Sequence, residues 1–141
     1  MRVHTADVVV YDASSGGVMA AVAAARHGAT VLLLCASWPA CFTEGGRQVG
    51  GMSSGGLGQT DLGCTDAVGG LALEFYTRNR RHYDKAIITG QPDIVSTSCR
   101  LPSPKCNVTW NLEPHVARAN FDAMLAEAGV SVLYEAQGAS V

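Results

Sequence analysis

The chain has 141 residues, of which 48% are hydrophobic and 16% are charged, and its net charge is −2. This length fits one domain or less, and the composition is too apolar for a disordered chain. So small a net charge creates no general field for nucleic acid or an anionic membrane, and neither partner is predicted. The sequence holds no apolar run of about 18 residues, so no membrane span is predicted.

The N-terminus and the cysteines bear on the cellular compartment. No secretory signal segment follows residues 1–7, so we expect a cytoplasmic protein. The five cysteines are odd in number and follow no metal-binding spacing, so no metal site is predicted. A disulfide between Cys99 and Cys106 is one alternative, but free thiols are favoured where no signal is present.

The first elements in chain order are a strand, a turn, a helix and a second strand. Residues 7–11 read as a short buried strand, and residues 12–17 read as a turn of small residues. An alanine-rich helix is predicted over 18–27 and a second buried strand over 29–34. This order is typical of the opening of a dinucleotide-binding βαβ unit.

The turn carries a degenerate form of the fingerprint G-x-G-x-x-G. In that pattern the first glycine makes a tight turn, the second admits a pyrophosphate, and the third lets the helix pack on the strand. Here those three places hold Asp12, Ser14 and Gly17, and Ser15 and Gly16 complete the turn. Only the third place therefore keeps its glycine.

Two replacements predict weakened nucleotide binding. Cys35 stands where an acidic residue would hold a ribose, and a small buried hydrophobe is the alternative reading of this cysteine. Asp12 places a negative charge near a pyrophosphate, and like charges about 4 Å apart repel by about 4 kcal/mol at an effective dielectric constant of about 20. That repulsion corresponds to about three decades of affinity. In the milder alternative, Asp12 points away and caps the helix.

The middle of the chain is rich in glycine. Residues 44–70 hold ten of the 16 glycines, and 44–66 is predicted as a loop that is ordered by a ligand rather than by its own packing. An amphipathic helix is predicted from Val68 to about Tyr83, and residues 86–106 read as an irregular excursion. A last helix has Pro114 in its first turn and ends at Gly129, before a third strand over 130–134.

The predicted fold class is α/β, a Rossmann-type parallel sheet with crossover helices. We expect strands 7–11, 30–34 and 130–134 to be parallel neighbours, with 7–11 between the other two and 17–27 as the first crossover helix. Three strands would leave edges exposed. We therefore expect residues 1–141 to be the N-terminal part of a larger dinucleotide-binding domain, or to need a partner.

Residues 47–61, RQVGGMSSGGLGQTD, resemble the signature loop of a family of FAD-dependent oxidoreductases. Those enzymes have a glutathione-reductase-like FAD domain and a GGM-(S/T)-SGGLG-x-TD segment. The segments 8–11, 69–76 and 110–117 fit the same family, and the resemblance runs from residue 7 to about residue 134. The family usually has Gly-Gly-Thr at positions 12–14, where this chain has Asp-Ala-Ser.

The resemblance implies an incomplete FAD-binding domain. It places the loop along the FAD pyrophosphate and the flavin edge, with these candidate binding residues: Gly50, Gly51, Met52, Ser53, Ser54 and Gly55. The implied reaction is hydride transfer from a small-molecule substrate to the flavin. No catalytic residue is named, because the family's substrate domain comes later in sequence than this segment.

Three alternatives stay open. The first is a diverged or truncated remnant that binds FAD weakly or not at all and acts as a structural or interaction module. An NAD-binding module is weaker, because the flavin-type loop would then have no purpose. The loop could also be a flexible surface segment. For His115, in the first turn of the last helix, a structural or solvated role is favoured over a catalytic one.

Overall fold

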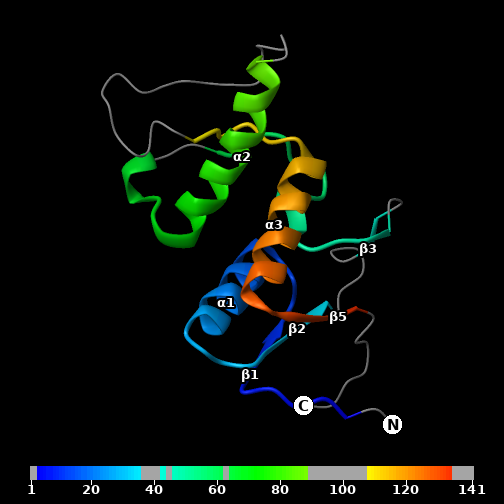
Figure 1. Cartoon of the computed structure of the whole chain (residues 1–141). Coiled ribbons are helices and arrows are strands. Elements are labelled where there is room, and N and C mark those ends of the chain that lie inside the picture. The colour runs from blue at the N-terminus through cyan, green and yellow to red at the C-terminus, as the bar shows by residue number, and fades with distance from the viewer. Residues whose placement is uncertain (1–2, 36–41, 44–45, 62–63, 89–107, 135–141) are drawn as a thin grey trace.

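The computed structural model describes residues 3–35, 42–43, 46–61, 64–88 and 108–134. Helices lie on one face of a small parallel sheet, and α2 packs on α3 farther from the strands (Figure 1). The predicted α/β fold is thereby confirmed. The elements are β1 (Val8–Tyr11), α1 (Ser15–Arg26), β2 (Val31–Cys35), β3 (Phe42–Thr43), β4 (Gly46–Arg47), α2 (Gly70–Ile88), α3 (Pro114–Ala128) and β5 (Ser131–Tyr134), with short 3₁₀ turns at Gly51–Ser53 and Thr65–Ala67.

The main sheet has the order β1-β2-β5, and both pairings are parallel. The predicted parallel neighbours and the crossover helix α1 are confirmed, but the predicted central place of 7–11 is wrong. β2 lies in the middle, paired with a strand on each side, and all five of its residues, VLLLC, are buried. β1 alternates instead, and its Val9 and Tyr11 are 43% and 68% exposed, which suits an edge.

Helix α1 begins earlier than predicted because Ser14 caps it. The Ser14 hydroxyl accepts a hydrogen bond from the Gly17 N–H at 3.4 Å, so the helix already includes Ser15 and both glycines of the turn. The helix ends at Arg26, and Gly28 follows in the left-handed conformation (φ +92°). This glycine stands one residue beyond the cap, where left-handed backbone ends a helix.

Of the two later helices, α2 differs from prediction and α3 agrees with it. α2 runs on to Ile88, so residues 86–88 of the predicted excursion are helical, and residues 89–106 lie outside the described part of the chain. α3 begins at Pro114, whose missing N–H harms nothing at that place, and Gly129 (φ +72°) caps its end, both as predicted.

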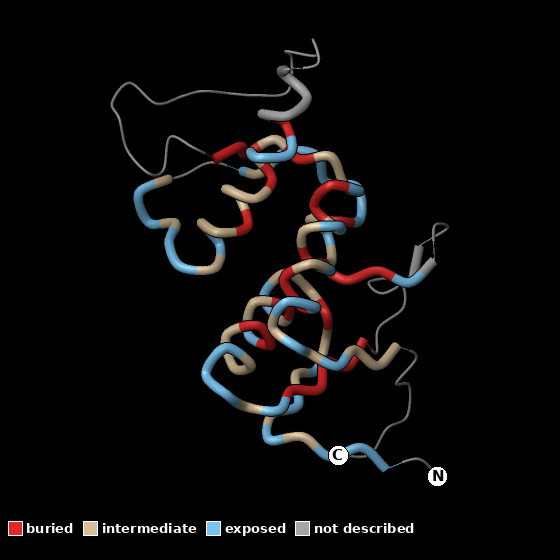
Figure 2. Tube along the Cα trace, viewed as in Figure 1, coloured by how far each residue is buried: buried red, intermediate tan, exposed pale blue. Residues whose placement is uncertain are grey.

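The core lies between α1, α3 and the helix-facing side of the sheet, where the buried residues gather (Figure 2). Val18, Val22 and Leu33 are 0% exposed, and Phe121 is 1% exposed. Phe121 stacks on Phe75 with 4.2 Å between ring centroids, which joins α3 to α2. Burial of each such large side chain contributes about 1.5–3 kcal/mol. No helix in the described part of the chain is both long and apolar enough to cross a membrane.

Candidate functional site

The turn after β1 has the left-handed backbone that usually requires glycine, although its first residue is Asp12. Asp12 has φ +84°, a left-handed conformation that non-glycine residues seldom adopt and that Asp tolerates better than most. A Cβ atom at position 17 would lie 1.9 Å from the backbone oxygen of Asp12 and 3.6 Å from Val10 Cγ1. Asp12, at the first place of the fingerprint, thus has a backbone conformation typical of glycine. The third place requires glycine itself, because the helix packs closely on the strand there.

The carboxylate of Asp12 is held at this turn and does not cap α1. Its Oδ1 atom is buried and has no hydrogen-bond partner within the described residues. The milder alternative, in which Asp12 caps the helix, is wrong because Ser14 fills that role. An acceptor oxygen without a donor is costly to bury, and at this place it opposes an incoming phosphate.

The glycine-rich loop is joined directly to this turn. The Gly50 N–H donates to the Ala13 oxygen at 2.7 Å, and Ser14 and Gly50 form a parallel bridge. The Ser15 hydroxyl donates to the Gly50 oxygen at 2.8 Å and lies 2.8 Å from the Ser53 hydroxyl. Because the one Ser15 proton is directed at the carbonyl, Ser53 is the donor in the second contact. The structure therefore brings two predicted segments together through backbone and hydroxyl groups.

The glycines of the loop are fixed largely by packing. Gly50 has φ +102°, and a Cβ there would lie 2.4 Å from the Phe121 ring. A Cβ at Gly55 would lie 2.9 Å from the Gly51 oxygen. The sequence did not reveal that Phe121, from a distant helix, packs beneath Gly50. The apolar spacing of the helix gave no signal for which loop it would support.

The remaining loop residues divide into inward and outward groups. Ser54 is 5% exposed and its hydroxyl donates to the Val49 oxygen, so this predicted cofactor contact faces inward. Met52 is 78% exposed and Leu57 is 53% exposed, so both present apolar surface to solvent. Gly16 is also exposed, with no atom within 4 Å of the place where a Cβ would stand.

Cys35 is separated from this open surface. It ends β2, is 0% exposed, and its Sγ atom lies 3.5 Å from the Gln48 oxygen. It takes part in a disulfide bond, so the predicted free thiol is wrong at this position, whereas Cys64 is free and exposed. A disulfide sulfur inside the core cannot replace a carboxylate that accepts two ribose hydroxyl groups.

The arrangement suits an anionic group at the backbone level. The first turn of α1, at the positive end of the helix dipole, includes Gly16, where no atom lies within 4 Å of the place of a Cβ. The glycine loop lies beside this helix start, so a phosphate could approach the backbone without side-chain obstruction. The Asp12 carboxylate is the one described feature of the turn that does not fit such a ligand. No described group of three or more His, Cys, Asp or Glu residues could hold a metal ion.

Comparison with known proteins agrees with this geometry. The family model described as FAD dependent oxidoreductase matches residues 7–141. The match covers both the turn and the glycine-rich loop. None of the curated proteins compared with the chain matches it.

Proposed function

Since this chain belongs to the FAD dependent oxidoreductase family, whose cofactor is FAD, we propose that it forms the N-terminal part of the FAD site of an oxidoreductase. The finer reaction that we propose is hydride transfer from a small-molecule substrate to the flavin. The contact between the 12–17 turn and the glycine loop, made by Gly50 N–H to the Ala13 oxygen at 2.7 Å, supports this proposal most strongly.

The residues of the turn and the loop have separate roles in this proposal. Backbone N–H groups of Ser15 and Gly16, at the start of α1, bind the pyrophosphate, aided by the helix dipole. Gly51 and Met52 follow the cofactor along the exposed edge of the loop. The hydroxyls of Ser15 and Ser53, 2.8 Å apart, keep the loop in register with the turn. FAD, when bound, supplies the redox chemistry, and the protein supplies position and electrostatics.

The proposal extends to partners and place in the cell. The substrate is a small molecule, and the groups that bind it belong to a substrate domain outside this chain. Neither nucleic acid nor a membrane is needed as a partner, in keeping with the net charge of −2. A cytoplasmic location is part of the same proposal.

Titration of FAD, followed by quenching of flavin fluorescence, tests the cofactor site. We expect weak binding by the unmodified chain and at least tenfold tighter binding by Asp12→Gly, because the phosphate repulsion is removed. Asp12→Asn is the matched control, since it removes the charge but keeps a side chain that tolerates φ +84°. Equal gains in both variants identify charge as the cause. A larger gain with glycine alone identifies the backbone.

A second function is favoured by one observation. The Oδ1 of Asp12, which has no hydrogen-bond partner among the described residues, suits a diverged, non-catalytic remnant better than a tight cofactor site. No gain from either variant in the FAD titration would favour this remnant. Tight binding by the unmodified chain would exclude it. Cys35→Glu would bury a carboxylate in the core, so its effect on FAD binding would not report on ribose contacts.

A further inference from the structure

Two histidines from different helices lie together at the α2–α3 contact. His82 belongs to α2 and His115 to the first turn of α3, and their ring centroids are 6.4 Å apart at an interplanar angle of 85°. Both residues are exposed. The sequence alone placed His115 at a helix start but gave no sign of its neighbour.

A buried tyrosine fixes the backbone on which His82 stands relative to the start of α3, where His115 lies. Tyr83 follows His82 on α2 and is 2% exposed, and its hydroxyl accepts a hydrogen bond from the Glu113 N–H at 2.9 Å. Burial raises the pKa of the Tyr83 hydroxyl, so it stays neutral. The His82 ring meets the Tyr83 ring edge to face at 5.2 Å. The backbone of α2 is thereby tied to the start of α3, next to His115.

Within the described residues, no hydrogen bond holds either imidazole in a structural role. Neither ring hydrogen-bonds to any described residue, whereas the His27 ring is occupied by the Ala23 oxygen at 2.8 Å. Imidazole nitrogen is the commonest protein ligand for zinc, nickel and copper. We propose that His82 and His115 together bind one divalent transition-metal ion and join α2 to α3 through it.

The separation of the rings suits this role. Two nitrogens bound to one tetrahedral ion at about 2.1 Å each lie about 3.4 Å apart. Rings whose centroids are 6.4 Å apart reach that spacing by rotation of two exposed side chains, which exchange rotamers rapidly. No third ligand is supplied by the described residues, so water completes the coordination. This site is independent of FAD and of the proposed redox function.

Calorimetric titration of the full chain with Zn²⁺ at pH 7.5, without FAD, tests the site. All proteins carry Cys64→Ser, because the exposed thiol of Cys64 would compete for the metal. We expect one saturable equivalent, and at least tenfold weaker binding in His82→Ala and in His115→Ala. His27→Ala is the control with a lone exposed histidine, and its affinity should match that of the parent.

Thermal unfolding with and without Zn²⁺ gives a second readout. The ion should raise the Tm of the parent and of His27→Ala, but not of the two variants that lack a ligand. Circular dichroism will show whether each variant folds, as expected for exposed positions. Absence of saturable binding, or unchanged affinity after loss of either His82 or His115, would overturn the proposal. Equal weakening by His27→Ala would also overturn it.

Discussion

At position 17 a single methyl group decides whether the turn can form. A Cβ there would stand 1.9 Å from the backbone oxygen of Asp12, and no flexible side-chain end could move aside to admit it. The glycine pattern of the sequence predicted close packing at this place. It could not predict that Asp12 would keep a left-handed backbone at φ +84°, because that depends on how the strand, the helix and the loop meet.

Gly17→Ala should therefore lower the free energy of unfolding by about 1–3 kcal/mol or more, the range found for overpacked sites. Gly16→Ala is the matched control, since no atom lies within 4 Å of its added methyl group and its φ is not left-handed. That change should stay within about 0.5 kcal/mol of the parent or stabilise it slightly, because alanine is a better helix former. Denaturant unfolding measures both. Equal stability of the two variants would contradict the packing argument.

At the scale of one element, the glycine loop is packed against the protein more closely than its composition suggests. Ten glycines in residues 44–70 suggested a segment ordered by ligand. The part nearest the turn has its own packing instead: Val49 is 0% exposed and Gly50 rests on Phe121. Composition could not reveal this anchoring, because the supporting residues come from distant helices. The prediction of a ligand-ordered loop therefore stays a prediction for the exposed residues 55–58.

Amide hydrogen exchange in the FAD-free chain should divide the loop in two. The Gly50 N–H, bonded to the Ala13 oxygen at 2.7 Å, should exchange slowly. The exposed Gly56 and Gly58, whose N–H groups have no backbone acceptor within the described residues, should exchange rapidly. Addition of FAD at saturating concentration should slow the second group. Slow exchange throughout residues 50–58 without FAD would show that the whole loop is ordered by its own contacts.

For the whole molecule, sequence periodicity was enough to predict the α/β class of the fold and the parallel pairing of its strands. It failed on strand order, since 7–11 and 30–34 are both short apolar runs and nothing in their composition says which lies in the middle. β5 pairs with β2, and the register Leu33–Val132 keeps both side chains on the helix-covered face of the sheet. The strand order thus depends on where α3 ends relative to the sheet, because β5 begins there. That position is set by helix packing and not by a local sequence pattern.

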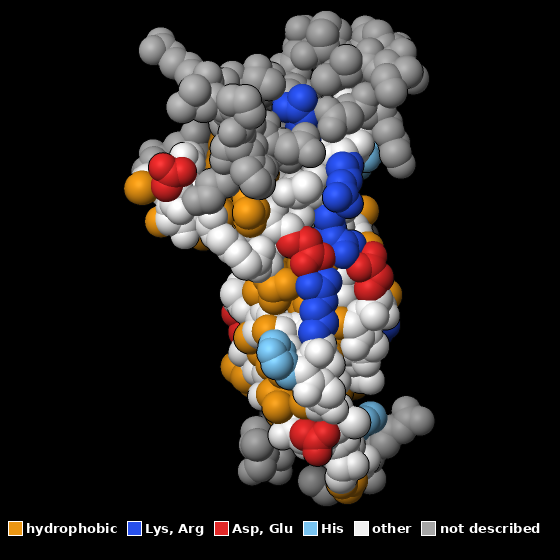
Figure 3. Space-filling model, turned by 60° about the vertical axis from the view of Figure 1, so that its left-hand side comes forward, with side chains coloured by type: hydrophobic (Ala, Val, Ile, Leu, Met, Phe, Trp, Pro, Cys, Tyr) orange, Lys and Arg blue, Asp and Glu red, His pale blue; other side chains and the backbone are white. Residues whose placement is uncertain are grey.

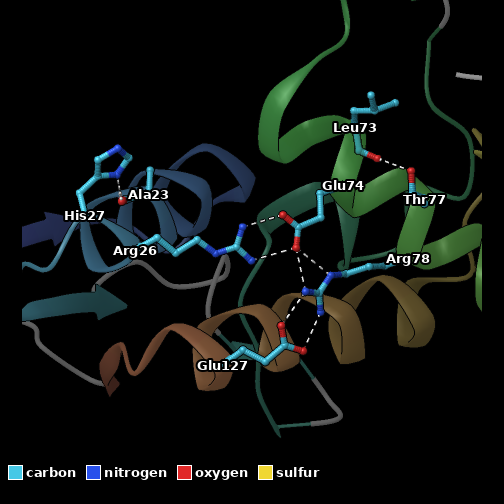
Figure 4. A network of polar contacts seen from close by, with 8 residues as sticks. All are labelled: Ala23, Arg26, His27, Leu73, Glu74, Thr77, Arg78 and Glu127. Atoms are coloured by element: carbon cyan, nitrogen blue, oxygen red, sulfur yellow. Dashed lines mark hydrogen bonds and ion pairs between the residues drawn. The ribbon is translucent and has the colours of Figure 1, made fainter. Parts of the chain in front are cut away.

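Charged groups also join three helices, and no local pattern predicts the contacts between those helices. Arg26 of α1 binds Glu74 of α2 through two hydrogen bonds of 2.6 and 2.9 Å. Arg78 bonds to Glu74 on its own helix and to Glu127 of α3, at 2.7 and 2.6 Å (Figure 4). Basic and acidic side chains gather along one stripe of this face (Figure 3). Bidentate arginine pairs in a network are stronger than isolated surface ion pairs.

The network should make stability depend on acid. Hydrogen bonds from Arg26, with help from Arg78, lower the pKa of Glu74 from 4.5 to about 2 in the folded chain. The contribution of the Glu74 carboxylate to the free energy of unfolding is therefore complete above about pH 4.5 and is lost as the pH falls toward 2. Partial solvent exposure reduces that contribution to about 1–2 kcal/mol.

Denaturant unfolding of the parent and of Glu74→Gln should show a difference in the free energy of unfolding, and this gap should shrink between pH 6 and pH 2. Asp122→Asn is the control, because burial raises the pKa of Asp122 and its contribution changes with pH in the opposite sense. A gap for Glu74→Gln that is constant with pH would show that the network adds no stability through this carboxylate.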